Sequence, residues 1–197
     1  MLIPLAQFFL LTERLEAALL RHKASPMVER IASLGLEVTP GYISDLKEFN
    51  GPSWRERAES ACTAATRAYC KVLDEANEVE TVAAAFILYG ALVVGGGKMT
   101  QKKVKKIMPS CSHALFDVDR KGEGMQELRS KFRRTFTEIG KDFPESFATL
   151  EAQAARFMHL NNTVVLSIRC WGTRATVVAL GVTVVGLACV ATWMKRR

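Results

Sequence analysis

The sequence predicts an all-α fold, a helical bundle followed by a C-terminal transmembrane helix. Apolar residues recur at helical spacing along most of the chain, and no segment shows the alternation of polar and apolar residues that is typical of strands. An uncharged run of 20 residues lies near the C-terminus. The 197 residues are 49% apolar, which favours one domain with a packed core over a disordered chain.

Turn residues and capping residues divide the first part of the chain into helices. Pro26 ends the first helical pattern, Thr-Pro-Gly at 39–41 predicts a turn, and Asn-Gly-Pro at 50–52 predicts a break. Ser53 and Glu56 have the spacing of a capping box at the start of a long helix. We therefore expect helices at residues 4–23, 27–36, 42–49 and 54–76.

Residues 82–106 contain the most informative pattern, VAAAFILYGALVVGGGKMTQKKVKK, and Thr81 is placed to cap this helix. Gly95, Gly96 and Gly97 lie in its middle, although each glycine costs about 1 kcal/mol relative to alanine inside a helix. Three glycines in succession predict a kink, or a place where the backbone comes close to a large, flat group.

The rest of the body is predicted to contain a loop and two helices. Residues 109–124 are rich in turn residues, and residues 125–141 have the pattern of a basic amphipathic helix. Asp117, Asp119 and Glu123, in the loop, lack the spacing of a calcium-binding loop. The last helix begins at Glu145, and we expect it to continue toward the membrane, so that residues 144–194 form one rod.

Residues 175–194 predict the transmembrane helix. At about 1.5 Å per residue this run reaches roughly 30 Å, the thickness of the hydrocarbon core of a bilayer. Trp171 and Trp193 lie at its edges, and basic residues flank both ends, so charge does not orient the helix. The predicted organisation is a helical domain at 1–165, a juxtamembrane linker at 166–174, the transmembrane helix at 175–194 and a basic tail at 195–197.

The net charge of +7 limits the kinds of partner. Positive charge beside apolar runs favours membrane lipid or an acidic protein subunit. No aromatic residues are interleaved with the lysines at 102, 103, 105 and 106, so we expect no nucleic-acid partner. The five cysteines have no CxxC spacing, so we expect reduced thiols and no metal site.

The order of four segments resembles the heme oxygenase family. LEAALLRHKASP at 15–26 is similar to the family's second helix, and DLKEFNGPSW at 45–54 is similar to its DL-x-F/Y-x-G-P-x-W segment. Residues 82–103 are similar to the family's distal helix, whose pattern is Tyr-x-Gly-Asp-x-Ser-Gly-Gly, and residues 125–139 and 152–162 are similar to the last two helices. The resemblance covers residues 1–165 and implies a heme-oxygenase-like bundle. Family members in animals also end in a membrane anchor.

The resemblance implies a set of heme-binding and catalytic groups, and this sequence has few of them. Family members bind heme iron through a histidine on the first helix, and that helix has no counterpart here, because the sequence begins where the second helix begins. A distal aspartate in the family orders the water that delivers protons, and Leu92 stands at that position. Tyr89, Gly95 and Gly96 match the family's tyrosine and glycine pair, whereas Ala91 replaces its first glycine.

If heme is bound, the resemblance implies that Gly95, Gly96, Arg129, Arg133 and His159 contact it. Arg129 and Arg133 lie near the family's propionate-binding positions, although a solvated basic helix face is the simpler interpretation. Each of the three histidines is better interpreted as a surface or core residue, and His159 is the least unsuitable iron ligand among them, because the last helix of this fold borders the pocket. Without heme, we expect residues 95–97 to be an inherited kink that packs against side chains.

The sequence therefore favours a non-catalytic, heme-oxygenase-like protein, a pseudoenzyme that acts as an accessory subunit of a membrane complex. We expect no catalytic residue and no cofactor. A mitochondrial membrane is the preferred location, with the endoplasmic reticulum as the alternative. Two other hypotheses remain open: an active heme oxygenase that releases biliverdin, and a heme carrier or sensor without turnover.

Overall fold

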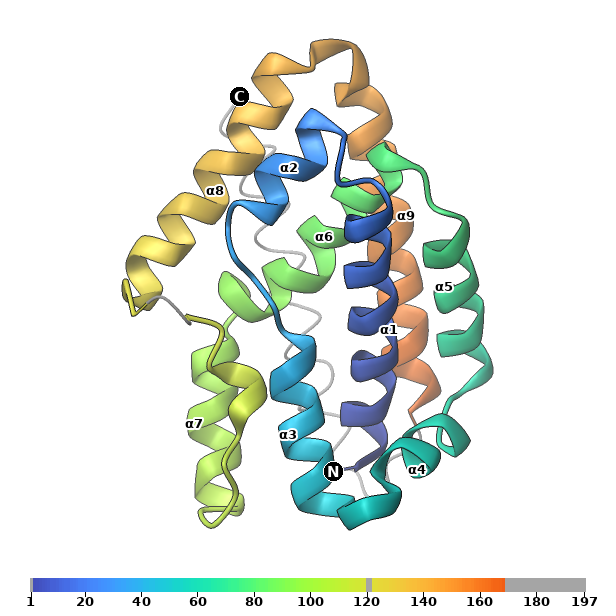
Figure 1. Cartoon of the computed structure of the whole chain (residues 1–197), viewed down its shortest axis with the longest axis vertical. Coiled ribbons are helices and arrows are strands. Elements are labelled where there is room, and N and C mark those ends of the chain that lie inside the picture. Colours follow the sequence, from blue (N-terminus) through green and yellow to red (C-terminus); the bar gives the residue numbers. More distant parts are fainter. Residues whose placement is uncertain (1, 120–121, 169–197) are drawn as a thin grey trace.

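The computed structural model describes residues 2–119 and 122–168, and these residues form helices and loops without any strand (Figure 1). The all-α prediction is therefore confirmed for this part of the chain. The helices are α1 (Leu2–Arg21), α2 (Pro26–Ala32), α3 (Thr39–Asn50), η1 (Gly51–Ser53), α4 (Trp54–Ser60), α5 (Ala64–Glu75), α6 (Glu78–Val93), α7 (Gly97–Ile107), η2 (Ala114–Phe116), α8 (Met125–Asp142) and α9 (Pro144–Ser167).

Helix α6 is the centre of the bundle. Its residues from Thr81 to Tyr89 are all buried except Phe86, which is half-buried, and a helix that is apolar on all sides belongs in a core. It packs most extensively against α9 and also contacts α1, α2 and α8. Three successive alanines, at 83–85, allow these neighbours to approach closely. Helices α1, α5 and α9 run side by side on one side of the molecule (Figure 1).

The sequence predicted one helix at residues 54–76. This prediction is wrong, because the chain breaks between α4 and α5. The cause is the buried side chain of Gln7 on α1, whose Nε2 donates to the Ala61 carbonyl at 2.9 Å. Its Oε1 accepts from the Thr63 amide at 2.9 Å and from the Thr66 hydroxyl at 2.7 Å. Thr63 then caps α5 by accepting from the Thr66 amide.

One predicted helix start and one predicted cap also differ from the structure, whereas α4 begins at Trp54 as predicted. The predicted turn at 39–41 is the first turn of α3, because Glu16 Oε1 accepts the Val38 and Thr39 amides at 2.8 and 3.0 Å and so replaces a local cap. Ser53 makes no capping hydrogen bond at the start of α4.

The capping box lies instead at the start of α6. The Asn77 side chain accepts from the Glu80 amide, and the Glu80 carboxylate accepts from the Asn77 amide, each at 3.0 Å. Thr81, the predicted cap, lies inside the helix and donates its hydroxyl to the Asn77 carbonyl at 2.7 Å. The helix therefore begins at Glu78, four residues earlier than expected.

The last helix ends sooner than the predicted rod. Helix α9 ends at Ser167, because Ile168 has extended backbone angles, φ −77° and ψ 102°. The predicted transmembrane helix at 175–194 lies outside the described residues. Among the described helices, none alone has the length and apolar composition needed to cross a membrane, whereas α6 and α7 taken together across their bend do.

Candidate functional site

The predicted kink is present between α6 and α7. Helix α6 ends at Val93, α7 begins at Gly97, and the two axes differ by 50°. Gly96 has φ 104° and ψ 23°, in the left-handed region that residues with a Cβ rarely adopt. The amides of Val94 and Gly95 both donate to the Gly90 carbonyl, at 2.9 and 2.8 Å, so the last turn of α6 widens to an i→i−5 bond before the chain turns.

The glycines allow the backbone to pack against itself. A Cβ on Gly97 would lie 2.3 Å from the Leu92 carbonyl oxygen, and one on Gly95 would lie 2.9 Å from the carbonyl oxygen of Ala91. The atoms nearest to such a Cβ are backbone atoms at Gly95 and Gly97. At Gly96 they belong to the side chain of Met99, at an ordinary contact distance of 3.7 Å.

The side chain of Arg129 on α8 contacts the kink at the end of α6. Its Nε donates to the Val93 carbonyl at 2.9 Å, which satisfies one of the carbonyls that the C-terminus of α6 leaves free. A cation at this position also interacts favourably with the negative end of the helix dipole. Arg133, one turn further along α8, is exposed, and no hydrogen bond or ion pair of its side chain is found among the described residues. The structure thus gives the two arginines different environments.

Aromatic side chains fill the space between α8 and the second half of α6. The ring centroids of Phe86 and Phe136 are 5.0 Å apart, and those of Phe132 and Phe136 are 4.7 Å apart. Phe132 also lies over Gly90, where a Cβ would meet its ring at 3.7 Å. The surface of α6 next to the kink is therefore covered by α8.

The three histidines lie in three separate places. His22 Nε2 lies 2.8 Å from the Ala76 carbonyl oxygen, and the buried His113 has its Nε2 2.8 Å from the Met108 carbonyl oxygen. His159 is exposed on α9, whose buried positions are Phe157 and Val164. The structure does not group His159 with Arg129 and the glycines in any hydrogen bond or ion pair between described residues.

Tyr89 and Leu92 occupy the apolar end of α6. The Tyr89 hydroxyl is buried and has no hydrogen-bond partner among the described residues. Burial, and then the nearby charges of Glu16 and Glu37, raise the pKa of Tyr89 well above its usual value, so this phenol remains neutral. Leu92 is half-buried against the core.

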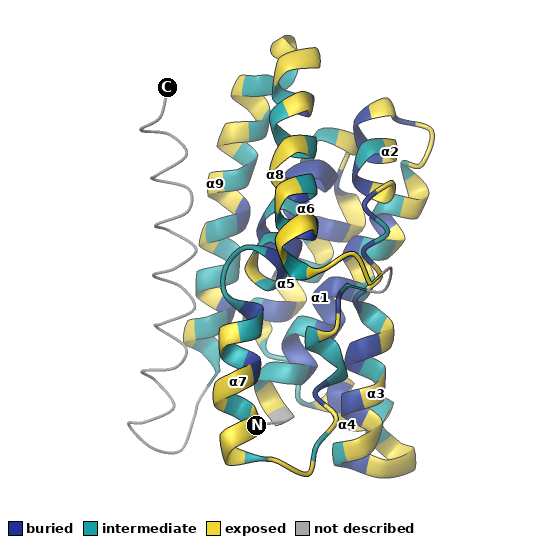
Figure 2. Cartoon of the chain, turned by 90° about the vertical axis from the view of Figure 1, so that its left-hand side faces the viewer, coloured by how far each residue is buried: buried dark blue, intermediate teal, exposed yellow. Residues whose placement is uncertain are grey.

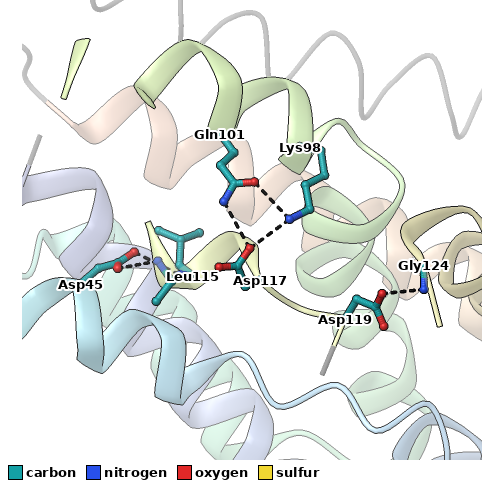
Figure 3. Close-up of polar contacts among 8 residues, drawn as sticks. Asp45, Lys98, Gln101, Leu115, Asp117, Asp119 and Gly124 are labelled. Atoms are coloured by element: carbon teal, nitrogen blue, oxygen red, sulfur yellow. Dashed lines mark hydrogen bonds and ion pairs between the residues drawn. The ribbon is translucent and has the colours of Figure 1, made fainter. Parts of the chain in front are cut away.

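Asp45 is the most important polar residue that sequence reasoning missed. It is only 1% exposed, and its carboxylate accepts from the amides of Ala114 at 2.7 Å and Leu115 at 3.1 Å (Figure 3). Ser112 Oγ lies 3.0 Å from this carboxylate and 2.6 Å from the Glu48 carboxylate, so the two carboxylates share its single proton. Gly41 permits this contact, because a Cβ there would lie 2.7 Å from the Ala114 carbonyl oxygen. Asp45 therefore holds the segment after α7 against α3.

The acidic residues of this loop have structural partners. Asp117 Oδ1 accepts from Lys98 at 3.0 Å and from Gln101 at 3.3 Å (Figure 3). Partial burial opposes ionisation of Asp117, but the hydrogen bonds from Lys98 and Gln101 outweigh it and lower the pKa of the carboxyl. Asp119 accepts the amides of Glu123 and Gly124 before α8. Within the described residues, no three His, Cys, Asp or Glu side chains are grouped to hold a metal ion.

A surface depression of about 300 Å³ lies away from the kink, between α1, α4 and α5. Its lining includes Cys62 and Cys70, and none of its lining residues comes from α6 or α7. Burial, and then the neighbouring Cys62, raise the pKa of Cys70 to about 12, so this thiol is a poor nucleophile.

Comparison with known proteins assigns these helices to a known family. The family model described as heme oxygenase matches residues 4–165. Among solved structures, the chain is similar to heme oxygenase 2 from Chlamydomonas reinhardtii, crystallised without heme, with 23% sequence identity and a TM-score of 0.76. The match covers 87% of this chain and 83% of that chain, and at this identity it shows the shared fold alone. A search of curated proteins finds no match.

Proposed function

The chain belongs to the heme oxygenase family, and we propose that it is a non-catalytic member, fixed to a membrane and acting as an accessory subunit of a membrane complex. Residues 1–165 would form the helical domain, 166–174 the juxtamembrane linker and 175–194 the anchor. A mitochondrial membrane is the preferred location, and the endoplasmic reticulum is the alternative.

The observation that most supports this proposal is that backbone contacts and the side chain of Arg129 occupy the kink. The resemblance to heme oxygenases implies that the glycines bring the distal helix close to a porphyrin. Here Gly95 and Gly97 bring it close to its own carbonyls at Ala91 and Leu92. Arg129, the candidate propionate-binding residue, is bonded to the backbone at Val93. Gly95 and Arg129, two of the residues expected to contact heme, therefore make contacts that serve the fold itself.

The histidines present do not fit the iron of a heme at this bend. His22 and His113 each have Nε2 within hydrogen-bonding distance of a backbone carbonyl, so using that nitrogen as a ligand would break a contact. His159 has no such contact but is exposed on α9. We therefore assign no step of a reaction to a bound heme.

The position that corresponds to the family's distal aspartate also lacks a group that could transfer protons. Leu92 stands where the family has an aspartate, and an aliphatic side chain neither transfers a proton nor orders water by hydrogen bonding. The nearby phenol of Tyr89 is buried and neutral. The position of the family's aspartate therefore has no acid–base group, and the ionisable pair nearest to the bend in sequence, Lys98 with Asp117, is engaged in its own hydrogen bond at 3.0 Å.

An accessory role is supported by the composition of the chain. The uncharged run at 175–194 is long enough to cross a bilayer, and the net charge of +7 suits an acidic protein subunit or anionic lipid. The test is gentle detergent extraction of the native membrane, followed by size separation of the tagged full chain. We expect migration within a larger assembly, and migration as a lone monomer would contradict the accessory role.

An active heme oxygenase is the second candidate, and family membership together with the shared fold favours it. The discriminating assay gives the full chain hemin and a reductant and follows the appearance of biliverdin. The proposed function predicts no biliverdin above a protein-free control. Turnover that disappears in His159→Ala would establish the enzyme and assign its ligand. A carrier or sensor would instead bind hemin without turnover, and Arg129→Glu with Arg133→Glu should abolish that binding.

A further inference from the structure

Helix α7 is the least packed of the longer helices. It extends away from the main bundle (Figure 1) and contacts only α6 and η2 to any extent among the described elements. Its inner face is fixed, because Lys98 and Gln101 both donate to Asp117, and Gln101 and Gly97 are buried (Figure 3). These contacts determine which face of α7 is presented outward.

The outward face combines one large apolar side chain with three lysines. Met99, Lys102, Lys103 and Lys106 are spaced at i, i+3, i+4 and i+7, which places them on one side of a helix. Met99 is 55% exposed, and Ile107, beside this face, is 77% exposed. All three lysines are exposed, and Figure 2 shows exposed positions along α7.

The positive charge of this face is not neutralised within the described structure. Helix α7 contains no acidic residue, and Lys102, Lys103 and Lys106 form no hydrogen bond or ion pair with any described residue. A favourable interaction with the helix dipole explains why an unpaired lysine stands at position 106, in the last turn of α7. It does not explain Lys102 and Lys103, which lie in the middle of the helix. Unpaired lysines with an exposed apolar side chain at each end of the stretch therefore need another explanation.

We propose that the outward face of α7 lies on an anionic lipid bilayer. Lysines that surround exposed apolar side chains on one helix face are typical of interfacial helices, in which the apolar groups enter the headgroup region and the ammonium groups meet lipid phosphates. A nucleic acid fits less well, because α7 has no aromatic side chain on which a base could stack. An acidic protein could form ion pairs with the lysines. It would not explain why the neighbouring apolar side chains of Met99 and Ile107 are exposed.

This inference rests on the proposed membrane location, but it does not depend on the loss of catalysis. It adds a second membrane contact, within the described domain, to the predicted anchor at 175–194. Such a contact would fix the orientation of the domain relative to the bilayer, because α7 is joined to the bundle through both α6 and Asp117.

The test uses the full chain assembled into lipid nanodiscs, either of phosphatidylcholine alone or with about a third phosphatidylserine. Co-elution with the discs measures membrane attachment by any route. Hydrogen–deuterium exchange of peptides covering Gly97–Ile107 measures contact by α7. We expect exchange to slow at least about fivefold in the anionic discs, because each lysine near an anionic surface adds substantially to binding, and to recover as salt rises.

Two variants with the same change of charge separate this surface from a general electrostatic effect. The variant K102E/K103E/K106E should lose the protection of α7, whereas K23E/K47E/K141E, at exposed lysines on other elements, should keep it. Equal exchange in the two kinds of disc would overturn the inference, and an acidic protein would then be the better partner. Co-elution with the anionic discs alone would support the membrane contact of α7 and count against a transmembrane anchor at 175–194. Co-elution with both kinds of disc, without slower exchange in α7, would support the anchor and count against the contact of α7.

Discussion

At the scale of single residues, Asp45 has the clearest structural role. Its buried carboxylate accepts two backbone amides and one hydroxyl from the segment Ser112–Leu115, which lies almost seventy residues further along the chain. Asp45→Asn keeps the shape but turns one acceptor into a donor that faces backbone amides. We expect the free energy of unfolding to fall by about 2–4 kcal/mol, measured by urea denaturation of the full chain in mild detergent.

A matched control for this change is Asp74→Asn. Asp74 pairs with Arg14 at 3.7 Å, with both side chains about half exposed, and such pairs contribute less than about 1 kcal/mol. A similar loss in both variants would show that burial of Asp45 does not matter.

Arg129 and Arg133 provide a second test at this scale. Arg129→Ala removes the donor to the Val93 carbonyl and should lower the stability by about 1–2 kcal/mol. Arg133→Ala, at an exposed position, should change it by less than about 0.5 kcal/mol. Thermal unfolding of both variants measures the difference, and equal effects would argue against the capping role of Arg129.

The contact between Glu48 and Ser112 predicts a dependence on pH. The hydroxyl and then the amide of Ser112 donate to the Glu48 carboxylate and lower its pKa below the usual 4.5. A carboxyl with a lowered pKa in the folded state stabilises that state above pH 4.5, and this contribution disappears as the pH falls through the folded-state pKa. The difference in melting temperature between wild type and Glu48→Gln should therefore shrink between pH 6 and pH 3. A difference that stays constant would contradict this origin.

At the scale of elements, the bend between α6 and α7 depends on particular glycines. Gly97→Ala would place a Cβ 2.3 Å from the Leu92 carbonyl oxygen, so the bend must open, at a cost of about 1–3 kcal/mol. Gly90→Ala is the matched control, because its Cβ would meet only the Phe132 ring at 3.7 Å. It should be neutral or stabilise the protein by up to about 1 kcal/mol, since alanine is the better helix former. Chemical denaturation compares the two, and a tolerated Gly97→Ala would refute the proposed packing.

Sequence patterns predicted helices well where the signals are local. The kink followed from three glycines, and the two ends of α8 from its periodicity and Pro144. The break between α4 and α5 could not be predicted, because it depends on Gln7, more than fifty residues earlier. The start of α3 was missed for the same reason, since Glu16 rather than a neighbouring residue caps it.

The candidate site was predictable only in part. Leu92 and the glycines can be read from their own segment, whereas the partner of Arg129 depends on how α8 packs against α6. Asp45 offered one usable signal: a carboxylate between Tyr42 and Leu46, which lie on the buried face of α3. A charged group at such a position needs buried donors, but the sequence does not say that residues 112–115 supply them.

At the scale of the whole molecule, the core and the bend between α6 and α7 are held together by different contacts. The core is centred on residues 81–89 of α6 and on α1 and α9, and none of these contacts requires a bound ligand. The bend, in contrast, is stabilised by Arg129 and by close backbone contacts. Under the proposed function, this separation would let the fold persist as a scaffold without its chemistry, because the core packing and the bend involve different residues.

The most direct test of this account is a hemin titration of the full chain, followed by the Soret absorption against a matched detergent blank. We predict a spectrum that follows the blank without saturation and that Arg129→Ala and His159→Ala leave unchanged. A saturable one-to-one complex with a shifted Soret band, lost in His159→Ala, would contradict the account.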